Sequence, residues 1–162
     1  MTVGPERLSA SLLRQPVHFL ALGFGAGLVP RAPGTAGTLV AVLPAWLIAP
    51  CPLPLRAALV LALFGLGVWV CGESARRLGT HDHPAIVLDE VVGFLAACLV
   101  LPAHPLWLPV AFVLFRFFDI AKPWPIRDLD HRLHGGVGIM LDDLVAALYA
   151  AACLSLANSL YS

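Results

Sequence analysis

The chain has 162 residues, of which 59% are hydrophobic and only 12% are charged. A soluble domain carries about 25% charged residues, so this composition argues against an ordinary soluble domain and predicts a multi-pass membrane protein. The formal net charge is zero, which argues against a nucleic-acid partner, because nucleic-acid-binding domains carry a basic excess. At this length we expect one domain covering residues 1–162.

The first apolar stretch, residues 15–30, carries no formal charge but is interrupted by Gly23, Gly25 and Gly27. Glycine in a helix costs about 1 kcal/mol relative to alanine. We therefore predict an interfacial or re-entrant N-terminal element here, and not a clean membrane span.

A turn-like segment, RAPGTAGTL, follows at residues 31–39. Its small residues allow backbone amides to approach an anion, and a helix that starts in it would point its N-terminus at one. Arg31, Thr35 and Thr38 are therefore candidate contacts for a substrate phosphate. Glycine and proline also mark ordinary turns, and that alternative stays open.

Five apolar runs predict an all-α, multi-pass membrane bundle of about five spans, since a span needs about 20 residues. These runs lie at residues 38–49, 57–72, 86–101, 106–122 and 144–161. The third and fourth runs share one uncharged stretch, which prolines near its middle divide into a hairpin. The hairpin returns Arg116 and Asp119 to the side that holds Asp89 and Glu90.

Nearly all charged residues lie on one side of this predicted bundle. That side holds all ten acidic residues and nine of the ten Lys and Arg residues, with Arg56 as the exception. Loops rich in Lys and Arg stay in the cytoplasm, so we predict a cytoplasmic polar face. Residues 115–143 hold nine of the twenty formally charged side chains, and charges beside hydrocarbon are usually paired or functional.

Two adjacent carboxylate pairs lie where a polar loop enters an apolar helix. With a further aspartate on a third helix they predict a metal site, because carboxylates converging from several helices hold metals in bundles. Oxygen-only ligation favours Mg²⁺ over zinc. The alternative is helix capping, in which acids in a first turn interact favourably with the helix dipole. The candidate catalytic residues are Asp89, Glu90, Asp119, Asp142 and Asp143, of which Asp89, Glu90, Asp142 and Asp143 are the candidate metal ligands.

Basic side chains in the same segment suit an anionic substrate. Arg116, Lys122 and Arg127 are candidate phosphate contacts, since arginine offers a planar fork and lysine a point charge. One alternative is an ion pair between Arg116 and Asp119, which lie three residues apart on a helix. The other is snorkelling of basic side chains to lipid headgroups, the interpretation that we favour for Arg132.

Two further features of the polar loops bear on the site. His81 and His83 are candidates for an acid/base pair or for metal ligands, although histidines in surface loops usually serve as neither. At residues 135–138, three glycines predict a thin loop before Asp142 that allows the backbone to approach a headgroup.

Four stretches of the chain form a combined pattern in a fixed order. They are GFGAGLVPRAPGTAGTL (23–39), HDHPAIVLDEVVGF (81–94), FRFFDIAKPWPIRDLD (115–130) and HGGVGIMLDDLVAALYA (134–150). Together they resemble the phosphatidylglycerophosphatase A family of bacterial lipid phosphatases. The resemblance implies Mg²⁺-dependent hydrolysis of phosphatidylglycerophosphate to phosphatidylglycerol and inorganic phosphate, in a protein integral to the bacterial inner membrane. One departure is Ala147, where the family leads us to expect glycine at a helix-packing position.

Other functions and mechanisms stay open from the sequence. A small transporter or channel subunit also uses charges, but near the bilayer midplane or along a path. A lipid-headgroup transferase usually shows DGxxAR…GxxxD…D, a signature that the chain lacks. For a phosphatase, the nucleophile is either a metal-activated water or a carboxylate. We favour water, because Asp128-Leu129-Asp130 is followed by His-Arg and not by the rest of the DxDx[TV] motif.

Overall fold

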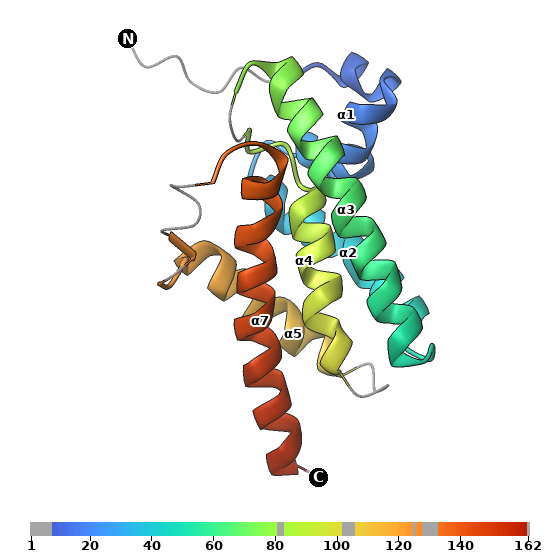
Figure 1. Ribbon diagram of the computed structural model, residues 1–162, viewed down its shortest axis with the longest axis vertical. Coiled ribbons are helices and arrows are strands. Elements are labelled where there is room, and N and C mark those ends of the chain that lie inside the picture. The colour runs from blue at the N-terminus through green and yellow to red at the C-terminus, as the bar shows by residue number, and fades with distance from the viewer. Residues whose placement is uncertain (1–7, 81–82, 102–105, 125, 128–132, 162) are drawn as a thin grey trace.

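The computed structural model describes residues 8–80, 83–101, 106–124, 126–127 and 133–161. In these ranges every regular element is a helix and no strand occurs (Figure 1), which confirms the all-α prediction there. The 3₁₀ elements are η1 (Ala10–Arg14), η2 (Gly23–Leu28) and η3 (Cys98–Val100). The α-helices are α1 (Pro16–Ala21), α2 (Pro33–Ile48), α3 (Leu53–Leu78), α4 (Leu88–Ala97), α5 (Trp107–Ala121) and α7 (Gly135–Tyr161).

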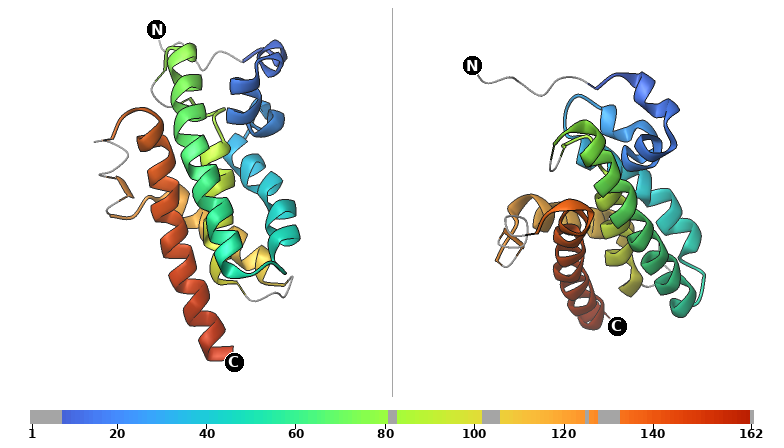
Figure 2. Two further views of the ribbon diagram at one scale, coloured as in Figure 1. Left: turned by 45° about the vertical axis from the view of Figure 1, so that its right-hand side comes forward. Right: turned by 45° about the horizontal axis from the view of Figure 1, so that its top comes forward.

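Helix α4 lies inside the bundle, in contact with α2, α3, α5 and α7 (Figures 1 and 2). Eight of its ten residues are buried. A helix of this length rises about 15 Å, so α4 covers only part of the length of the longer helices beside it. Its first turn, which carries Asp89 and Glu90, is therefore surrounded by neighbouring helices.

Two helices are long and apolar enough to cross a membrane, namely Leu53–Leu78 and Gly135–Leu160. Helices α2, α4 and α5 have 16, 10 and 15 residues, fewer than the ~20 that a span needs. The described helices therefore do not support the predicted count of five spans. Apolar composition alone overestimates the number of membrane spans, because a run buried against other helices is as apolar as one that faces lipid.

The predicted hairpin is present, because the helical path breaks between η3 and α5 and Arg116 on α5 returns to 3.9 Å from Glu90 at the start of α4; the residues of the predicted turn, 102–105, lie outside the described ranges. Helix α7 starts at Gly135, earlier than predicted. The expected thin glycine loop is therefore wrong. A Cβ on Gly136 would meet the backbone of Val68 on α3, so this glycine allows the start of α7 to pack against α3. Ala147 is buried, as expected of a packing position.

The N-terminal segment forms the short helices η1, α1 and η2. The Nδ1 atom of His18 on α1 lies 2.8 Å from the Oγ atom of Ser74 on α3. Burial lowers the pKa of His18 and so disfavours the charged ring. The Val87 N–H donates to the Ala21 carbonyl at 2.9 Å. The segment therefore braces the residues that lead into α4.

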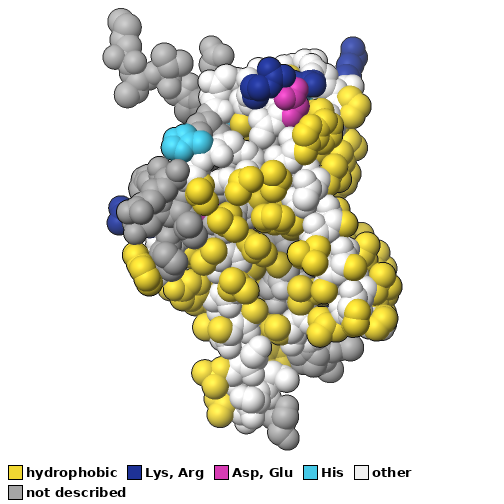
Figure 3. Space-filling view, viewed as in Figure 1, with side chains coloured by type: hydrophobic (Ala, Val, Ile, Leu, Met, Phe, Trp, Pro, Cys, Tyr) yellow, Lys and Arg dark blue, Asp and Glu magenta, His cyan; other side chains and the backbone are white. Residues whose placement is uncertain are grey.

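Helices α3 and α7 run antiparallel, since Gly67 lies beside Met140 while Gly72 lies beside Gly136. The end of α3 and the start of α7 are therefore at the same end of the bundle. Figure 3 shows the Lys, Arg, Asp and Glu side chains of this face towards that end, above a broad hydrophobic surface. This separation is what a protein at a membrane–water boundary requires.

The antiparallel pairing predicts the result of cysteine labelling. In vesicles of known orientation, Thr80→Cys and Leu133→Cys should react with a membrane-impermeant maleimide from the same side, because both positions lie beyond the polar ends of α3 and α7. The parent protein provides the background from its own cysteines. Labelling of the two positions from opposite sides would contradict this arrangement.

Candidate metal and phosphate site

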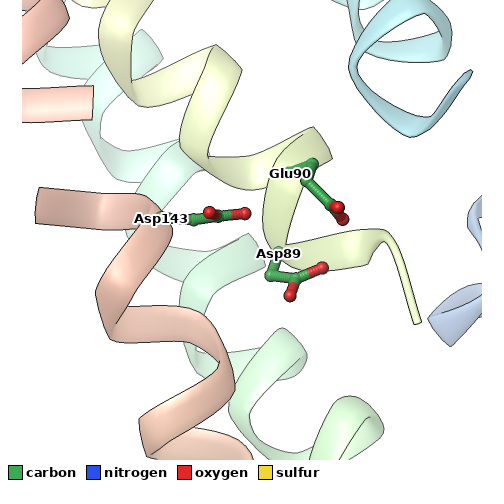
Figure 4. A group of neighbouring side chains, drawn as sticks. All are labelled: Asp89, Glu90 and Asp143. Atoms are coloured by element: carbon green, nitrogen blue, oxygen red, sulfur yellow. The ribbon is translucent and has the colours of Figure 1, made fainter. Parts of the chain in front are cut away.

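Three carboxylates converge between α4 and α7. Figure 4 shows Asp143 on α7 directed towards Asp89 and Glu90 in the first turn of α4. One ligand oxygen from each residue lies within 4.8 Å of the others. Asp143 is 3% exposed and Asp89 is 9% exposed. The prediction that acids from separate helices meet is thus realised for these three residues.

Glycine at one position of α4 makes this convergence possible. An ideal Cβ built on Gly93 would lie 3.1 Å from the Cβ of Asp143 and 2.8 Å from the Cζ of Phe115. A larger residue there would separate α4 from both α5 and α7. Gly93 is not among the residues predicted from the sequence, although a lone glycine within a helical pattern is a recognised sign of close packing.

Helix capping does not explain Asp142 and Asp143. Both lie about two turns inside α7, which begins at Gly135, whereas capping and dipole effects are confined to the first turn. Asp89 and Glu90 do lie in the first turn of α4, where the helix dipole favours negative charge.

The cluster contains buried oxygen atoms that need a partner. Within the described residues, Oε2 of Glu90 and Oδ2 of Asp143 are buried and accept no hydrogen bond. Burying a carboxylate oxygen without a compensating interaction is costly. A hard cation among the three carboxylates would compensate these oxygens, and an all-oxygen donor set suits Mg²⁺.

Arg116 on α5 lies at the edge of the cluster. Its Nη1 atom forms an ion pair with Asp119 on the same helix and lies 3.9 Å from Oε1 of Glu90. The Asp119 carboxylate in turn lies near the Asp143 side chain. The expected ion pair between Arg116 and Asp119 is therefore present, and it joins the carboxylate cluster instead of standing apart from it.

The start of α2 forms a second wall beside these groups. A Cβ on Gly34 would collide with Oε1 of Glu90 and lie 3.1 Å from Nη1 of Arg116. Ala32, the N-cap residue, has a positive φ of 53°, and no side chain caps the helix. The Thr38 hydroxyl is buried and donates to the Gly34 carbonyl at 3.0 Å. The first backbone amides of α2 thus lie close to Glu90 and Arg116.

The other predicted site residues are placed less centrally. Lys122 at the end of α5 forms an ion pair with Asp142, with 2.8 Å between Nζ and Oδ2. Asp142 is not one of the three carboxylates that meet in the cluster. The Nδ1 atom of His83 accepts a hydrogen bond from the Ala85 N–H at 3.1 Å. Thr35 is half-buried, Arg31 and Arg127 are exposed, and His81 and Arg132 lie outside the described residues.

Comparisons with known proteins agree on one family. Residues 19–158 match the family described as phosphatidylglycerophosphatase A. The chain is 43% identical over 154 residues to phosphatidylglycerophosphatase A of Escherichia coli, covering 94% of this chain and 87% of the relative. The Haemophilus influenzae protein of the same name is 43% identical over 140 residues, covering 85% and 86%.

A third relative carries a different name. It is a putative phosphatidylinositol-3-phosphatase of Bacteroides thetaiotaomicron, 36% identical over 148 residues, with 86% of this chain and 91% of the relative covered. No solved structure matches the chain.

The contact at Gly34 predicts a steric effect on the cluster. In Gly34→Ala, the new Cβ would push the Glu90 carboxylate away, and we expect divalent-cation affinity to fall about tenfold or more, equivalent to ~1.4 kcal/mol. Calorimetry with Mg²⁺ on the detergent-solubilised protein measures this. Gly65→Ala is the matched control, because nothing lies within 4 Å of a Cβ there. Equal affinities in the two variants would show that Gly34 does not constrain Glu90.

Proposed function

Because this chain belongs to the phosphatidylglycerophosphatase A family, we propose that it hydrolyses phosphatidylglycerophosphate to phosphatidylglycerol and inorganic phosphate. The named relatives at 43% identity over most of the chain support an enzyme of this kind. The structural observation that carries the proposal is the meeting of Asp89, Glu90 and Asp143 beside Arg116. Such a site combines ligands for a cation with a donor for a phosphate.

Mg²⁺ is the cofactor that these residues suit. Asp89, Glu90 and Asp143 would hold it, and Asp119 lies near them, paired with Arg116. When bound, the ion would neutralise negative charge on the phosphate oxygens and lower the pKa of water.

The basic groups and the start of α2 bind the phosphate in this proposal. Arg116 offers planar donors at the edge of the cluster, and Lys122 and Arg127 follow it in the chain. Arg31, Thr35 and the first amides of α2 form the opposite wall, which favours anions through the helix dipole. Phosphoryl transfer depends mainly on such positioning and charge stabilisation.

The reaction breaks the bond between phosphorus and the glycerol oxygen. Water is the nucleophile that we favour, and a carboxylate attacking phosphorus is the alternative. The leaving oxygen takes up a proton, and His83 is a candidate donor through Nε2, since its Nδ1 is engaged by the Ala85 N–H. His81 has the same candidate role, but it lies outside the described residues.

The membrane setting of the proposal follows from charge and apolar surface. We place the enzyme in the bacterial inner membrane with its charged end in the cytoplasm, because nine of ten Lys and Arg residues cluster in the polar segments. A transporter or channel subunit is not favoured, because Asp89, Glu90, Asp143 and Arg116 form one compact cluster and not a path. The relatives at 43% identity are also named as phosphatases.

Phosphate release from the purified protein in mixed micelles tests the function. We expect Mg²⁺-dependent release from phosphatidylglycerophosphate and a loss of activity with EDTA. Phosphatidylinositol 3-phosphate is the comparison substrate, because one relative is named for it. Preference for that lipid would replace the proposed substrate, and no release from either lipid would contradict the function.

The carboxylate cluster predicts which acids the reaction needs. Asp89→Asn and Asp143→Asn remove charge at nearly constant shape, and we expect kcat to fall about 10²–10³-fold, as for loss of one charge-stabilising group. Glu73→Gln is the matched control, since Glu73 pairs with Arg76 and Arg77 at 2.8 Å and 2.7 Å, away from the cluster. Near-normal activity of both Asn variants would place the site elsewhere.

The basic residues give a separate prediction. Arg116→Gln, Lys122→Gln and Arg127→Gln should each lower kcat/KM by about 10²–10³-fold, because a charged contact to the phosphate is lost. Arg77→Gln should have a small effect, since Arg77 pairs with Glu73. Arg132→Gln should also be mild. The measurement is kcat/KM at a fixed ratio of protein to detergent, and small equal losses in all five variants would indicate that these bases serve only the membrane surface.

A further inference from the structure

The two neighbouring aspartates of α7 have different partners. Asp143 is directed towards Asp89 and Glu90 on α4 (Figure 4). Asp142 instead contacts Lys122 at the end of α5, with 2.8 Å between Oδ2 and Nζ. Consecutive helical residues project about 100° apart, so a rigid helix directs the two carboxylates to different places. From the sequence alone, both aspartates are candidate metal ligands.

The backbone of Lys122 is held in an unusual conformation. Its φ and ψ are 41° and 60°, in the left-handed region, where a residue with a side chain is strained. Its N–H donates to the Phe118 carbonyl at 2.9 Å and closes α5. Glycine is the usual residue in this position. Strained residues of this kind persist where the surrounding structure requires them, and they gather at functional sites.

Burial and donor count show what the pair can do. The side chain of Asp142 is 10% exposed and that of Lys122 is 28% exposed, so the carboxylate is the inner member and the ammonium the outer one. An ammonium group has three N–H donors. One donor can remain with Asp142 while another meets a phosphate oxygen.

We propose that Asp142 is a positioning residue that holds Lys122 beside the site, and that it is not a ligand of the metal ion. The ammonium of Lys122 then donates to the phosphate of the lipid substrate, opposite the carboxylates that hold the cation. This inference rests on the proposed function for the identity of the substrate. Of the two aspartates predicted as metal ligands, Asp143 then binds the metal ion and Asp142 holds Lys122.

Metal binding without substrate is the first test. Calorimetry with Mg²⁺ on the detergent-solubilised protein should show Asp142→Asn within about twofold of the parent, whereas Asp143→Asn should bind about tenfold more weakly or worse. Thermal unfolding checks that each variant is folded, and Asp142→Ser, which also removes the carboxylate, replaces the Asn variant if that one is unstable. Equal losses of affinity in the Asp142 and Asp143 variants would overturn the proposal.

A double-mutant cycle is the second test. Lys122→Gln should lower kcat/KM about a hundredfold, and Asp142→Asn should lower it less. If Asp142 acts only through Lys122, the double variant should match Lys122→Gln alone, because interacting residues are not additive. If the losses in kcat/KM of the two single variants instead multiply in the double variant, Asp142 acts independently of Lys122 and the proposal is overturned.

The outcomes separate this inference from the proposed function. A parent protein that releases no phosphate from either lipid contradicts the function, while metal affinity still decides the role of Asp142. The affinity for inorganic phosphate provides a further measure. Lys122→Gln and Asp142→Asn should both weaken phosphate binding without changing the affinity for Mg²⁺.

Discussion

The close approach of α2, α5 and α7 to α4 is the constraint on which the rest of the structure depends. Gly93 allows α7 to bring Asp143 against α4, and Gly34 allows the start of α2 to reach Glu90. A side chain at Gly34 would collide with the Glu90 carboxylate, and one at Gly93 would press on the Phe115 ring and the Cβ of Asp143. Packing and electrostatics therefore depend on the same contacts in this protein, because the contacts that fill the bundle also bring its acidic side chains together.

Gathering acids in this way raises an electrostatic cost that the surrounding groups reduce. Carboxylates that share a buried site repel one another strongly where the dielectric constant is low. Helix α5 and its end supply the described cations that touch these acids, with Arg116 beside Glu90 and Asp119, and Lys122 beside Asp142. The start of α2 adds the positive end of a helix dipole. The remaining buried oxygens are the structural reason to expect a bound cation.

The position of the site relative to the apolar surface suits a lipid substrate. Hydrophobic side chains cover much of the face drawn in Figure 3, and charge lies towards one end. Trp124 follows α5 with 76% of its surface exposed, and its carbonyl accepts a hydrogen bond from the Tyr149 hydroxyl at 2.8 Å. Exposed tryptophan is typical of a membrane interface. Under the proposed function, the phosphate of the lipid would lie at the charged end and its acyl chains beside the apolar surface.

The sequence by itself determined the helical class, the break between α4 and α5, the family, and the residue types of the site, because hydrophobic runs, prolines and adjacent acids are local signals. The number of membrane spans and the residues at which helices start were not determined by local signals. Apolar residues of α4 are buried by other helices, and the glycines before Asp142 lie in α7, with Gly136 packed against α3. Only the tertiary structure decided which acids meet, since α7 directs Asp143 to α4 and Asp142 to Lys122, a division that depends on helix rotation and not on residue type.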